Sequence, residues 1–503
     1  MRIRQILTNA ISPDSSGRGF LTLVFALQVA AVFAAGQPRT GGRRLPVYYP
    51  GETAVFGVGA EDYEIADENL ETVARGRGAE VPHTALGGKF GAFRFTSGTV
   101  TNWFAFLPSR EVKPCPWVGT VTHPSFGWAF GNLIAVEAMA AGGYGIVREF
   151  NRWSSREQKK GVFTRDPNYD AYLGALREKG IRTIQLLVWG NKIYENPIDP
   201  EAYANYCAWS VKTYGKDVAY FEIWNEARNF EFRKVYGDKQ WLAKFVETTC
   251  VAKKAMRAID PDVRIGVASE DMEGDLLRMV ERGIADERDV ITFHPYSHKQ
   301  HRPERDYFFR DYGARLKDYA LRHGGAHRWG ITEVGWTTYQ GAGQYWDVAG
   351  SYPRASYAGQ ADCLVRMYLS ARAAGVEFVC QHHLRDFGSR RPYTEHNFGV
   401  LFEDYSPKPA FAAVAALTRL IGQAQYAGRL EDDSSRYRVI AFKAGDRRIL
   451  GCWSVEGDFV WRVPAAAAEA TVIDLYGNRL GRLPSRNLTL VERPVYLEFP
   501  SGR

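Results

Sequence analysis

Two glutamates in the middle of the chain each lie at the end of a short apolar run. Glu226 ends the string FEIWNE, and Glu333 lies within the string ITEVGW. Two carboxyl groups ~5–5.5 Å apart suit retaining cleavage of a glycosidic bond. One carboxylate attacks the anomeric carbon, while the other protonates the leaving oxygen and later activates water. We therefore expect Glu226 and Glu333 to act as such a pair if the fold brings them together.

Other polar and aromatic residues lie at or near the ends of neighbouring apolar runs. Asn225 precedes Glu226 and can hydrogen-bond a sugar hydroxyl beside the reacting centre. Arg148 and Tyr296 can hold a nucleophilic carboxylate ionised by charge and hydrogen bonding, while a drier site keeps the acid protonated. Tryptophan faces can stack on sugar rings. The remaining candidates for substrate binding are two histidines and three tryptophans: His294, His382, Trp153, Trp189 and Trp336.

Each of these candidates also has a structural interpretation. Arg148 could neutralise a buried Glu222, His294 could be an ordinary hydrogen-bonded histidine, and the tryptophans could pack under loops. His382 and His383, together with His294, raise the idea of a zinc site. However, the chain has neither the HExxH motif nor the paired-cysteine spacing that zinc sites usually show. We therefore predict no metal and no cofactor.

The elements that must position these residues are eight short apolar runs that alternate with helical stretches. Predicted strands cover residues 118–123, 145–151, 183–189, 218–224, 264–268, 290–294, 329–333 and 377–382. Predicted amphipathic helices cover residues 169–179, 201–214, 241–259, 308–322, 361–373 and 410–421. Eight β-then-α units over about 310 residues are typical of a (β/α)8 TIM barrel. A doubly wound open sheet is disfavoured, because no GxGxxG or P-loop follows the first strand.

A TIM barrel places its active site at the C-terminal ends of the strands. Glu226 and Glu333 would then end the fourth and seventh strands, which lie across the barrel mouth from each other. Arg148 would lie on the second strand, His294 and Tyr296 at the end of the sixth, and His382 at the end of the eighth. The fold class therefore predicts that these polar side chains meet at one rim.

The same strings carry a resemblance to a known superfamily. FEIWNE and ITEVGW resemble the two catalytic strand ends of glycoside hydrolase clan A, whose members are retaining (β/α)8 glycosidases. The string HPY at residues 294–296 resembles the clan's strand-six signature. FEIWNE is especially similar to family thirty-nine, which includes β-xylosidases and α-L-iduronidases. The resemblance covers residues 118–421 in order and spacing.

This resemblance implies roles for individual residues. Glu226 would be the acid/base and Glu333 the nucleophile, and the supporting residues would be Asn225, Arg148, His294 and Tyr296. The sequence departs from the pattern at three places. Ala227 stands where many relatives have proline, and EVGW is closer to other clan members than to family thirty-nine. His382 or His383 replaces a tryptophan that usually ends strand eight.

Short β-like runs flank the predicted barrel on both sides. We expect a β region at residues 37–113, the catalytic barrel at 114–424 and a β-sandwich domain at 425–503. The predicted C-terminal strands include residues 437–442, 449–453, 471–475 and 495–499. The sequence leaves open whether the two β regions form one unit or two.

The N-terminus has the order of a secretory signal. Arg2, Arg4 and Arg18 precede an apolar run over residues 20–35, and small residues follow. The run is shorter than the ~20 residues of a bilayer span, so a signal peptide over residues 1–36 is favoured over an uncleaved anchor. We therefore expect a secreted or periplasmic protein without stable membrane insertion. Its six cysteines could pair in an oxidising compartment or remain buried thiols.

Composition narrows the class of function. The 64 Lys and Arg residues against 57 Asp and Glu give a net charge of +7 that is spread along all 503 residues. Because nucleic-acid-binding proteins concentrate basic residues in patches, we expect no nucleic-acid partner. The sequence predicts an exported retaining glycoside hydrolase that acts on a polysaccharide or oligosaccharide. Alternatives are a catalytically silent carbohydrate-binding barrel and a metal-dependent hydrolase; the sugar, the linkage and the oligomeric state are left open.

Overall fold

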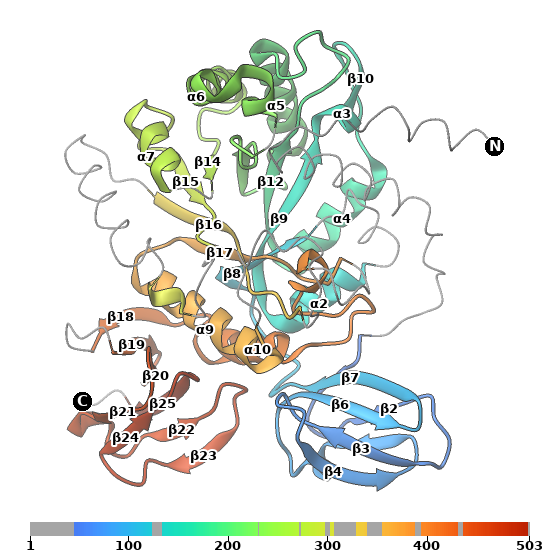
Figure 1. The fold of residues 1–503 in the computed structure, drawn as a ribbon, viewed down its shortest axis with the longest axis vertical. Coiled ribbons are helices and arrows are strands. Elements are labelled where there is room, and N and C mark those ends of the chain that lie inside the picture. Colours follow the sequence, from blue (N-terminus) through green and yellow to red (C-terminus); the bar gives the residue numbers. More distant parts are fainter. Residues whose placement is uncertain are drawn as a thin grey trace, which may run out of the picture. The chain divides into compact units, whose positions relative to one another are not determined.

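The structure is a computed structural model in which residues Arg44–Arg503 form one compact unit (Figure 1). It describes residues 45–122, 133–229, 231–270, 273–296, 302–305, 328–339, 355–387, 394–430 and 436–500. The predicted signal segment at residues 1–36 and the predicted helix at residues 308–322 lie outside the described residues.

Eight parallel strands close into a barrel, which confirms the predicted TIM fold (Figure 1). The strands follow one another around the ring in sequence order, and the first pairs with the last. They are β8 (Cys115–Thr122), β9 (Tyr144–Arg152), β12 (Arg182–Val188), β13 (Tyr220–Ile223), β14 (Ile265–Glu270), β15 (Val290–Phe293), β16 (Arg328–Val334) and β17 (Phe378–Gln381). All eight overlap the strands predicted from the sequence.

Alternate residues of the strands fill the barrel interior, as the two-residue period of a strand requires. Ile146, Leu186 and Phe378 belong to one buried apolar cluster inside the ring. Gly330 makes room for the large ring of Phe378, because a Cβ at position 330 would lie 2.5 Å from Phe378 Cζ. Arg148 follows Ile146 by two residues and therefore points to the same interior. The apolar layer thus ends where a buried charged layer begins.

Helices cover the outside of the barrel. Several of them begin at a side chain that caps the first turn: Asp166 and Asp199 accept hydrogen bonds from the first turns of α4 and α5, and Ser356 does the same for α9. The helices are α2 (Ile134–Gly142), α4 (Pro167–Glu178), α5 (Pro200–Tyr214), α6 (Phe232–Ile259), α7 (Glu273–Glu281), α9 (Tyr357–Ala373) and α10 (Pro409–Ile421). Short pieces α3 (Trp153–Arg156), β10 (Glu157–Lys159) and β11 (Val162–Phe163) follow the second strand.

The N-terminal β region is a five-stranded sheet with a two-stranded partner. Its aromatic core includes Phe56 and Phe95, whose rings stack 3.9 Å apart. On the other face of the sheet, Trp103 contacts the rings of Tyr357 and Phe402 at 5.3 and 5.7 Å. The sheet order is β1 (Val47–Tyr48), β7 (Val100–Phe106), β6 (Gly91–Ser97), β3 (Asp62–Ala66) and β4 (Thr72–Arg77), and β2 (Thr53–Val55) pairs with β5 (Glu80–Pro82).

The C-terminal β region is a six-stranded sheet with a separate two-stranded sheet beside it. Leu450 of the larger sheet and Trp461 and Leu490 of the smaller one share a buried core. The opposite face packs on the barrel, where Gly451 approaches Leu369 of α9. The order in the larger sheet is β18 (Gln425–Arg429), β19 (Tyr437–Ala444), β20 (Arg447–Ser454), β25 (Val495–Pro500), β22 (Thr471–Ile473) and β23 (Arg479–Arg482); the smaller sheet pairs β21 (Phe459–Arg462) with β24 (Asn487–Leu490).

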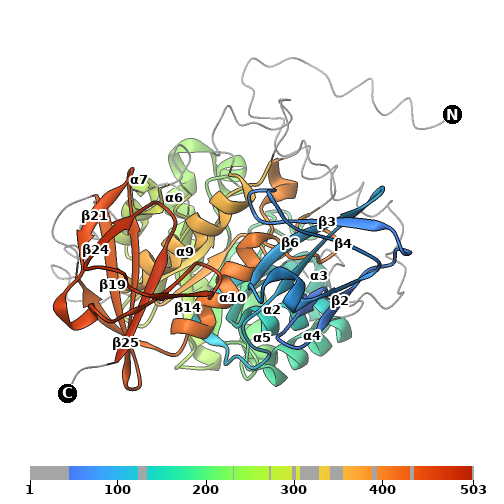
Figure 2. The same ribbon diagram turned by 90° about the horizontal axis from the view of Figure 1, so that it is seen from below.

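The two β regions have separate sheets, as Figure 2 also shows. Their buried cores are separate as well. They still touch through polar side chains. Asn478 Oδ1 accepts a 2.7 Å hydrogen bond from the backbone N–H of Phe90, and Arg493 pairs with Glu68 at 2.6 Å. The flanks therefore contact each other without forming one sandwich.

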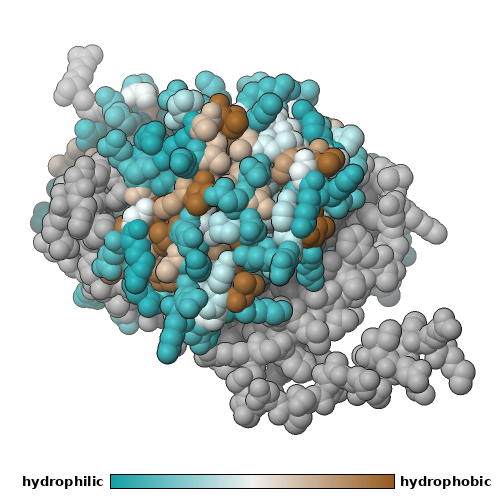
Figure 3. Space-filling model, turned by 90° about the horizontal axis from the view of Figure 1, so that it is seen from above, coloured by the Kyte–Doolittle hydropathy of each residue, from teal (hydrophilic) through white to brown (hydrophobic). Residues whose placement is uncertain are grey.

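One face of the molecule is mainly polar (Figure 3), and the cysteines are unpaired. The face seen in Figure 3 is mainly hydrophilic, with small apolar areas between polar side chains. Within the described ranges, no helix is both long and apolar enough to span a bilayer. All six cysteines are free thiols, and only Cys250 is exposed. Of the two cysteine outcomes left open by the sequence, the structure has the unpaired one.

Candidate active site

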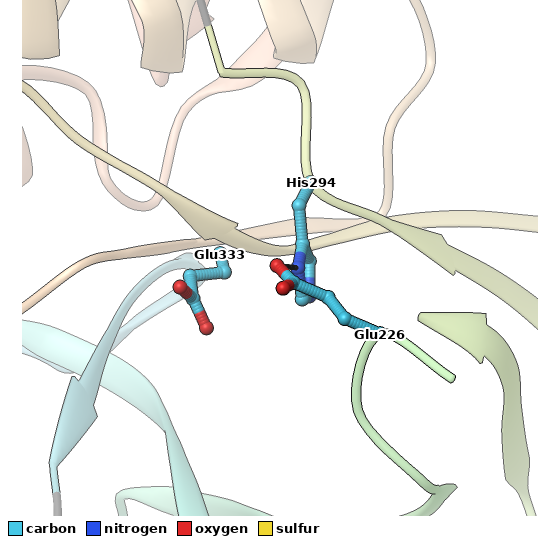
Figure 4. A group of neighbouring side chains, drawn as sticks. All are labelled: Glu226, His294 and Glu333. Atoms are coloured by element: carbon cyan, nitrogen blue, oxygen red, sulfur yellow. Dashed lines mark hydrogen bonds and ion pairs between the residues drawn. The ribbon is translucent and has the colours of Figure 1, made fainter. Parts of the chain in front are cut away.

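Glu226 and Glu333 converge on one space at the C-terminal end of the barrel strands (Figure 4). Glu226 follows β13, and Glu333 lies on β16. One carboxylate oxygen from each, together with a ring nitrogen of His294, lie within 4.8 Å of one another. Both side chains are 14% exposed, so each reaches the solvent-facing side of the site.

A tight turn after β13 aims Glu226 into this space. Trp224 and Glu226 adopt left-handed backbone angles, with φ of 63° and 44°, which are uncommon for residues other than glycine. The backbone N–H of Glu226 donates a 2.8 Å hydrogen bond to the carbonyl of Ser269 on β14. The neighbouring strand therefore fixes the turn that presents the carboxylate.

Arg148 connects the site to the barrel interior. Its side chain is fully buried on β9, and Nε donates to Glu222 Oε2 at 2.5 Å. Nη1 donates to Glu333 Oε2 at 2.9 Å, and Nη2 donates to Asn225 Oδ1 at 2.7 Å. Burial alone would lower the pKa of Arg148, but the two carboxylates outweigh burial and raise it. Arg148 therefore neutralises Glu222, as its structural interpretation proposed, and also contacts Glu333.

Glu333 has two further partners. The hydroxyl of Tyr296 donates to its Oε1 at 2.8 Å, and His382 Nδ1 lies 3.6 Å from the same oxygen. Burial alone would raise the pKa of Glu333, but its interactions with His382, His294 and Arg148 and the hydrogen bond from Tyr296 lower the pKa to about 2. Burial lowers the pKa of His382 to about 4, so His382 is neutral at neutral pH. Arg148 and Tyr296 therefore hold Glu333 ionised at neutral pH.

Glu226 has partners of a different kind. His294 Nδ1 lies 2.8 Å from Glu226 Oε1, and Asn229 Nδ2 donates to Oε2 at 3.2 Å. His294 is fully buried beneath the carboxylate. Burial alone would lower the pKa of His294, but its hydrogen bond to Glu226 and the nearby negative charges raise it. An imidazole and an amide thus face Glu226, whereas a guanidinium and a phenol face Glu333.

The structure separates the predicted tryptophans. Trp189 is half-buried beyond β12, with its ring 5.7 Å from Phe150 and the guanidinium of Arg152 5.1 Å above it. Trp153 and Trp336 are 0% and 2% exposed, so the prediction that their faces stack on sugar is wrong for this conformation. Trp153 packs in an aromatic cluster and donates from Nε1 to Glu157. Trp336 belongs to the same buried core, so both rings face the interior.

Residues that the sequence reasoning did not select also line the site. Ser269 receives a 3.1 Å hydrogen bond from Arg148 Nη2 and lies 3.4 Å from His294 Nε2. The ring of Phe398 packs against Tyr296 and His382 at 6.2 and 5.4 Å. Ser269 lies near the end of β14, an otherwise apolar strand, and that position was its only signal in the sequence. Phe398 lies in a loop, where strand position gives no signal.

Comparison with known proteins finds solved structures with a similar fold. Neither a protein-family model nor a curated protein matches the sequence. A family 39 glycoside hydrolase from Bacteroides cellulosilyticus is similar in structure, with a TM-score of 0.70, 19% identity, and coverage of 90% of this chain and 98% of the other.

Two further solved structures are similar. A family 39 β-xylosidase from Caulobacter crescentus has a TM-score of 0.51, 15% identity, and coverage of 78% of this chain and 98% of the other. A family 30 endoxylanase from Clostridium papyrosolvens has a TM-score of 0.52, 10% identity and the same coverages of 78% and 98%. The chain therefore has the fold of these glycoside hydrolases.

Proposed function

We propose that this protein is a glycoside hydrolase that cleaves with retention of anomeric configuration. The observation that carries the proposal is the short separation of the two carboxylates, whose nearest oxygens are no more than 4.8 Å apart. Retaining enzymes hold their carboxyl groups ~5–5.5 Å apart, whereas inverting enzymes leave ~6.5–9.5 Å for a water molecule. The spacing at Glu226 and Glu333 suits direct attack on the sugar.

The different surroundings of the two carboxyl groups support an assignment of the two roles. Glu333 is the nucleophile, because its pKa of about 2 leaves it ionised and able to attack the anomeric carbon. Glu226 is the acid/base: it follows the fourth barrel strand, where the His294 imidazole and the Asn229 amide face it, whereas Arg148 donates to Glu333. A fixed guanidinium favours the charged form of the carboxylate that it contacts, so of the two it is Glu333 that is held ionised.

The reaction then has two steps. The Glu333 carboxylate forms a bond to the anomeric carbon as the glycosidic C–O bond breaks, and the leaving oxygen takes a proton from Glu226. In the second step the Glu226 carboxylate removes a proton from water, the water oxygen attacks the anomeric carbon, and the bond to Glu333 breaks. Both residues return to their starting protonation states.

Asn225 and Trp189 are the best placed residues for holding the sugar. Arg148 fixes the amide of Asn225 by donating to Oδ1, which turns Nδ2 toward a donor role. A donor beside the nucleophile can bind the hydroxyl next to the reacting carbon, and this hydrogen bond strengthens in the transition state. Trp189 offers a partly exposed ring for stacking. The substrate class is a polysaccharide or oligosaccharide; the titles of similar structures, which name a β-xylosidase and an endoxylanase, support it.

A panel of aryl glycosides and polysaccharides tests the proposal. The product anomer that forms first, observed by proton NMR, is expected to have the configuration of the substrate. Formation of the opposite anomer, or failure to cleave any member of the panel, would contradict the proposal. Because the panel includes uronosides as well as neutral glycosides, it also identifies the sugar.

Metal-dependent hydrolysis is the second candidate, because Glu226, His294 and Glu333 place three donor atoms within 4.8 Å. In the carboxylate mechanism the positive charge beside Glu333 is already supplied by Arg148, 2.9 Å away. We therefore expect full activity after dialysis against EDTA. Loss of activity that Zn²⁺ or another divalent ion restores would favour the metal mechanism instead.

We also propose that the protein is exported with residues 1–36 as a cleaved signal. The support is the order of basic, apolar and small residues at the start of the chain. N-terminal sequencing of the protein from the medium or periplasm is expected to start near residue 37. Protein retained in the cytoplasm with Met1 intact would contradict this proposal.

A further inference from the structure

Ser269 is a buried polar residue between two groups of the site. It lies on β14 with its side chain fully buried and a left-handed φ of 43°. Its hydroxyl oxygen is 3.1 Å from Arg148 Nη2 on one side and 3.4 Å from His294 Nε2 on the other. The strained backbone holds this side chain between a guanidinium and an imidazole. These two groups therefore determine the hydrogen bonds of the hydroxyl.

The direction of each hydrogen bond follows from donor and acceptor chemistry. A guanidinium has donors only, so Ser269 Oγ must accept from Arg148. The serine has one proton to donate, and the nearest described acceptor is His294 Nε2. If Nε2 accepts, the proton of a neutral imidazole is on Nδ1. Nδ1 lies 2.8 Å from Glu226 Oε1, so it donates to the carboxyl group.

We propose that Ser269 is a positioning residue that holds His294 with its proton on Nδ1, so that His294 donates to Glu226 and cannot take its catalytic proton. This inference rests on the proposed function, in which Glu226 is the acid. Since Oε1 accepts from His294, the proton that Glu226 transfers is on Oε2.

The charges around His294 explain why such a device is needed. Burial and the charge of Arg148 oppose a second proton on the imidazole, whereas Glu226 and Glu333 favour it. A doubly protonated imidazole would have N–H groups at both nitrogens. The proton on Nε2 would then occupy the position at which that nitrogen accepts the hydrogen bond from the Ser269 hydroxyl. Without the hydroxyl, a proton can leave Glu226 for His294, and the leaving group loses its acid.

Nitrogen NMR of the wild-type protein tests the proposal without any activity. With ¹⁵N-labelled histidine, His294 is identified among the 10 histidines by its loss in His294→Gln. We expect a protonated Nδ1 and an unprotonated Nε2 at neutral pH. In Ser269→Ala, we expect a proton on Nε2 as well. A wild-type imidazole protonated at Nε2, or at both nitrogens, would overturn the proposal, as would an unchanged spectrum in Ser269→Ala.

Kinetics give the second readout. Ser269→Ala is expected to lose about tenfold in kcat/KM on glycosides with poor leaving groups, a part of the usual general-acid contribution. It should lose less than about twofold with a dinitrophenyl leaving group, which needs no acid. Ser269→Gly relieves the left-handed backbone and also lacks the hydroxyl, so it should show the same pattern. Ala268→Gly is the matched control, because Ala268 has a φ of 83° in the same bulge and should keep wild-type activity.

These outcomes separate the two proposals. If wild-type protein cleaves no glycoside, the proposed function fails while the NMR result still decides the imidazole tautomer. If it cleaves with retention but Ser269→Ala loses activity equally for all leaving groups, the function stands and the role of Ser269 is wrong. Should the alanine variant fold poorly, the glycine variant and the wild-type spectrum decide.

Discussion

The two carboxylates of the site are equally exposed but differ in what surrounds them. Glu226 and Glu333 are each 14% exposed at the ends of their strands. Glu333 faces the Arg148 guanidinium and the Tyr296 hydroxyl, whereas Glu226 faces the His294 imidazole and the Asn229 amide. Exposure therefore does not separate the roles; the neighbouring charge and donors do. In the proposed function, this difference in neighbours lets one barrel rim hold an ionised nucleophile and a protonated acid side by side.

The largest effect is expected from neutralising the charged side of the pair. Glu333→Gln keeps the size of the side chain but removes the nucleophile, so kcat should fall by about 10⁴-fold or more. Steady-state assay with an aryl glycoside measures it, with circular dichroism to verify folding. Glu377→Gln is a matched control. Glu377 accepts a 2.8 Å hydrogen bond from the Tyr220 hydroxyl at the N-terminal ends of the barrel strands, away from the carboxylate pair. Wild-type rates in Glu333→Gln would remove Glu333 from the mechanism.

A smaller and conditional effect is expected on the other side. Glu226→Ala removes the acid/base, so activity on poor leaving groups should fall about 10²–10⁴-fold. With an activated leaving group the first step survives, and added azide should restore turnover by attacking the glycosyl-enzyme in place of water. Rate measurements with and without azide check this, and the glycosyl azide product should be retained in configuration. No change in rate in this variant would rule out Glu226 as the acid.

The smallest effect is expected from removing one hydrogen bond to Glu333, which tests the electrostatic difference between Glu333 and Glu226. Tyr296→Phe removes one hydrogen bond from Glu333 and should lower kcat/KM about tenfold. Because that hydrogen bond helps to lower the pKa of Glu333 to about 2, the acid limb of the pH profile should move to higher pH. Tyr206→Phe is the control, since the Tyr206 hydroxyl donates to the Asn151 carbonyl outside the carboxylate pair. An unmoved acid limb would mean that Tyr296 does not tune Glu333.

The barrel could be predicted from the sequence, because strand periodicity and strand ends are local properties. All eight predicted strands form, and Glu226, Glu333, Arg148, His294 and Tyr296 come together. Helix α2 escaped prediction because its sequence IAVEAMAAG is apolar on nearly every face and has no amphipathic pattern.

What the sequence could not supply was the orientation of side chains beyond the strand ends. Trp153 and Trp336 are as near to strand ends as Trp189, yet only Trp189 is partly exposed. The direction of such rings depends on loops and helices far away in the chain. Ser269 was missed for a related reason, because its role depends on Arg148 and His294 from two other strands.

Covalent trapping tests the central claim most directly. A 2-deoxy-2-fluoro glycoside with a good leaving group, of the sugar found in the substrate panel, slows breakdown of the glycosyl-enzyme so that it accumulates. Intact-protein mass spectrometry should show addition of one fluoro-sugar, and peptide mapping should place it on Glu333. Attachment to any other residue, or time-dependent turnover without a covalent adduct, would contradict the assignment of Glu333 as the nucleophile.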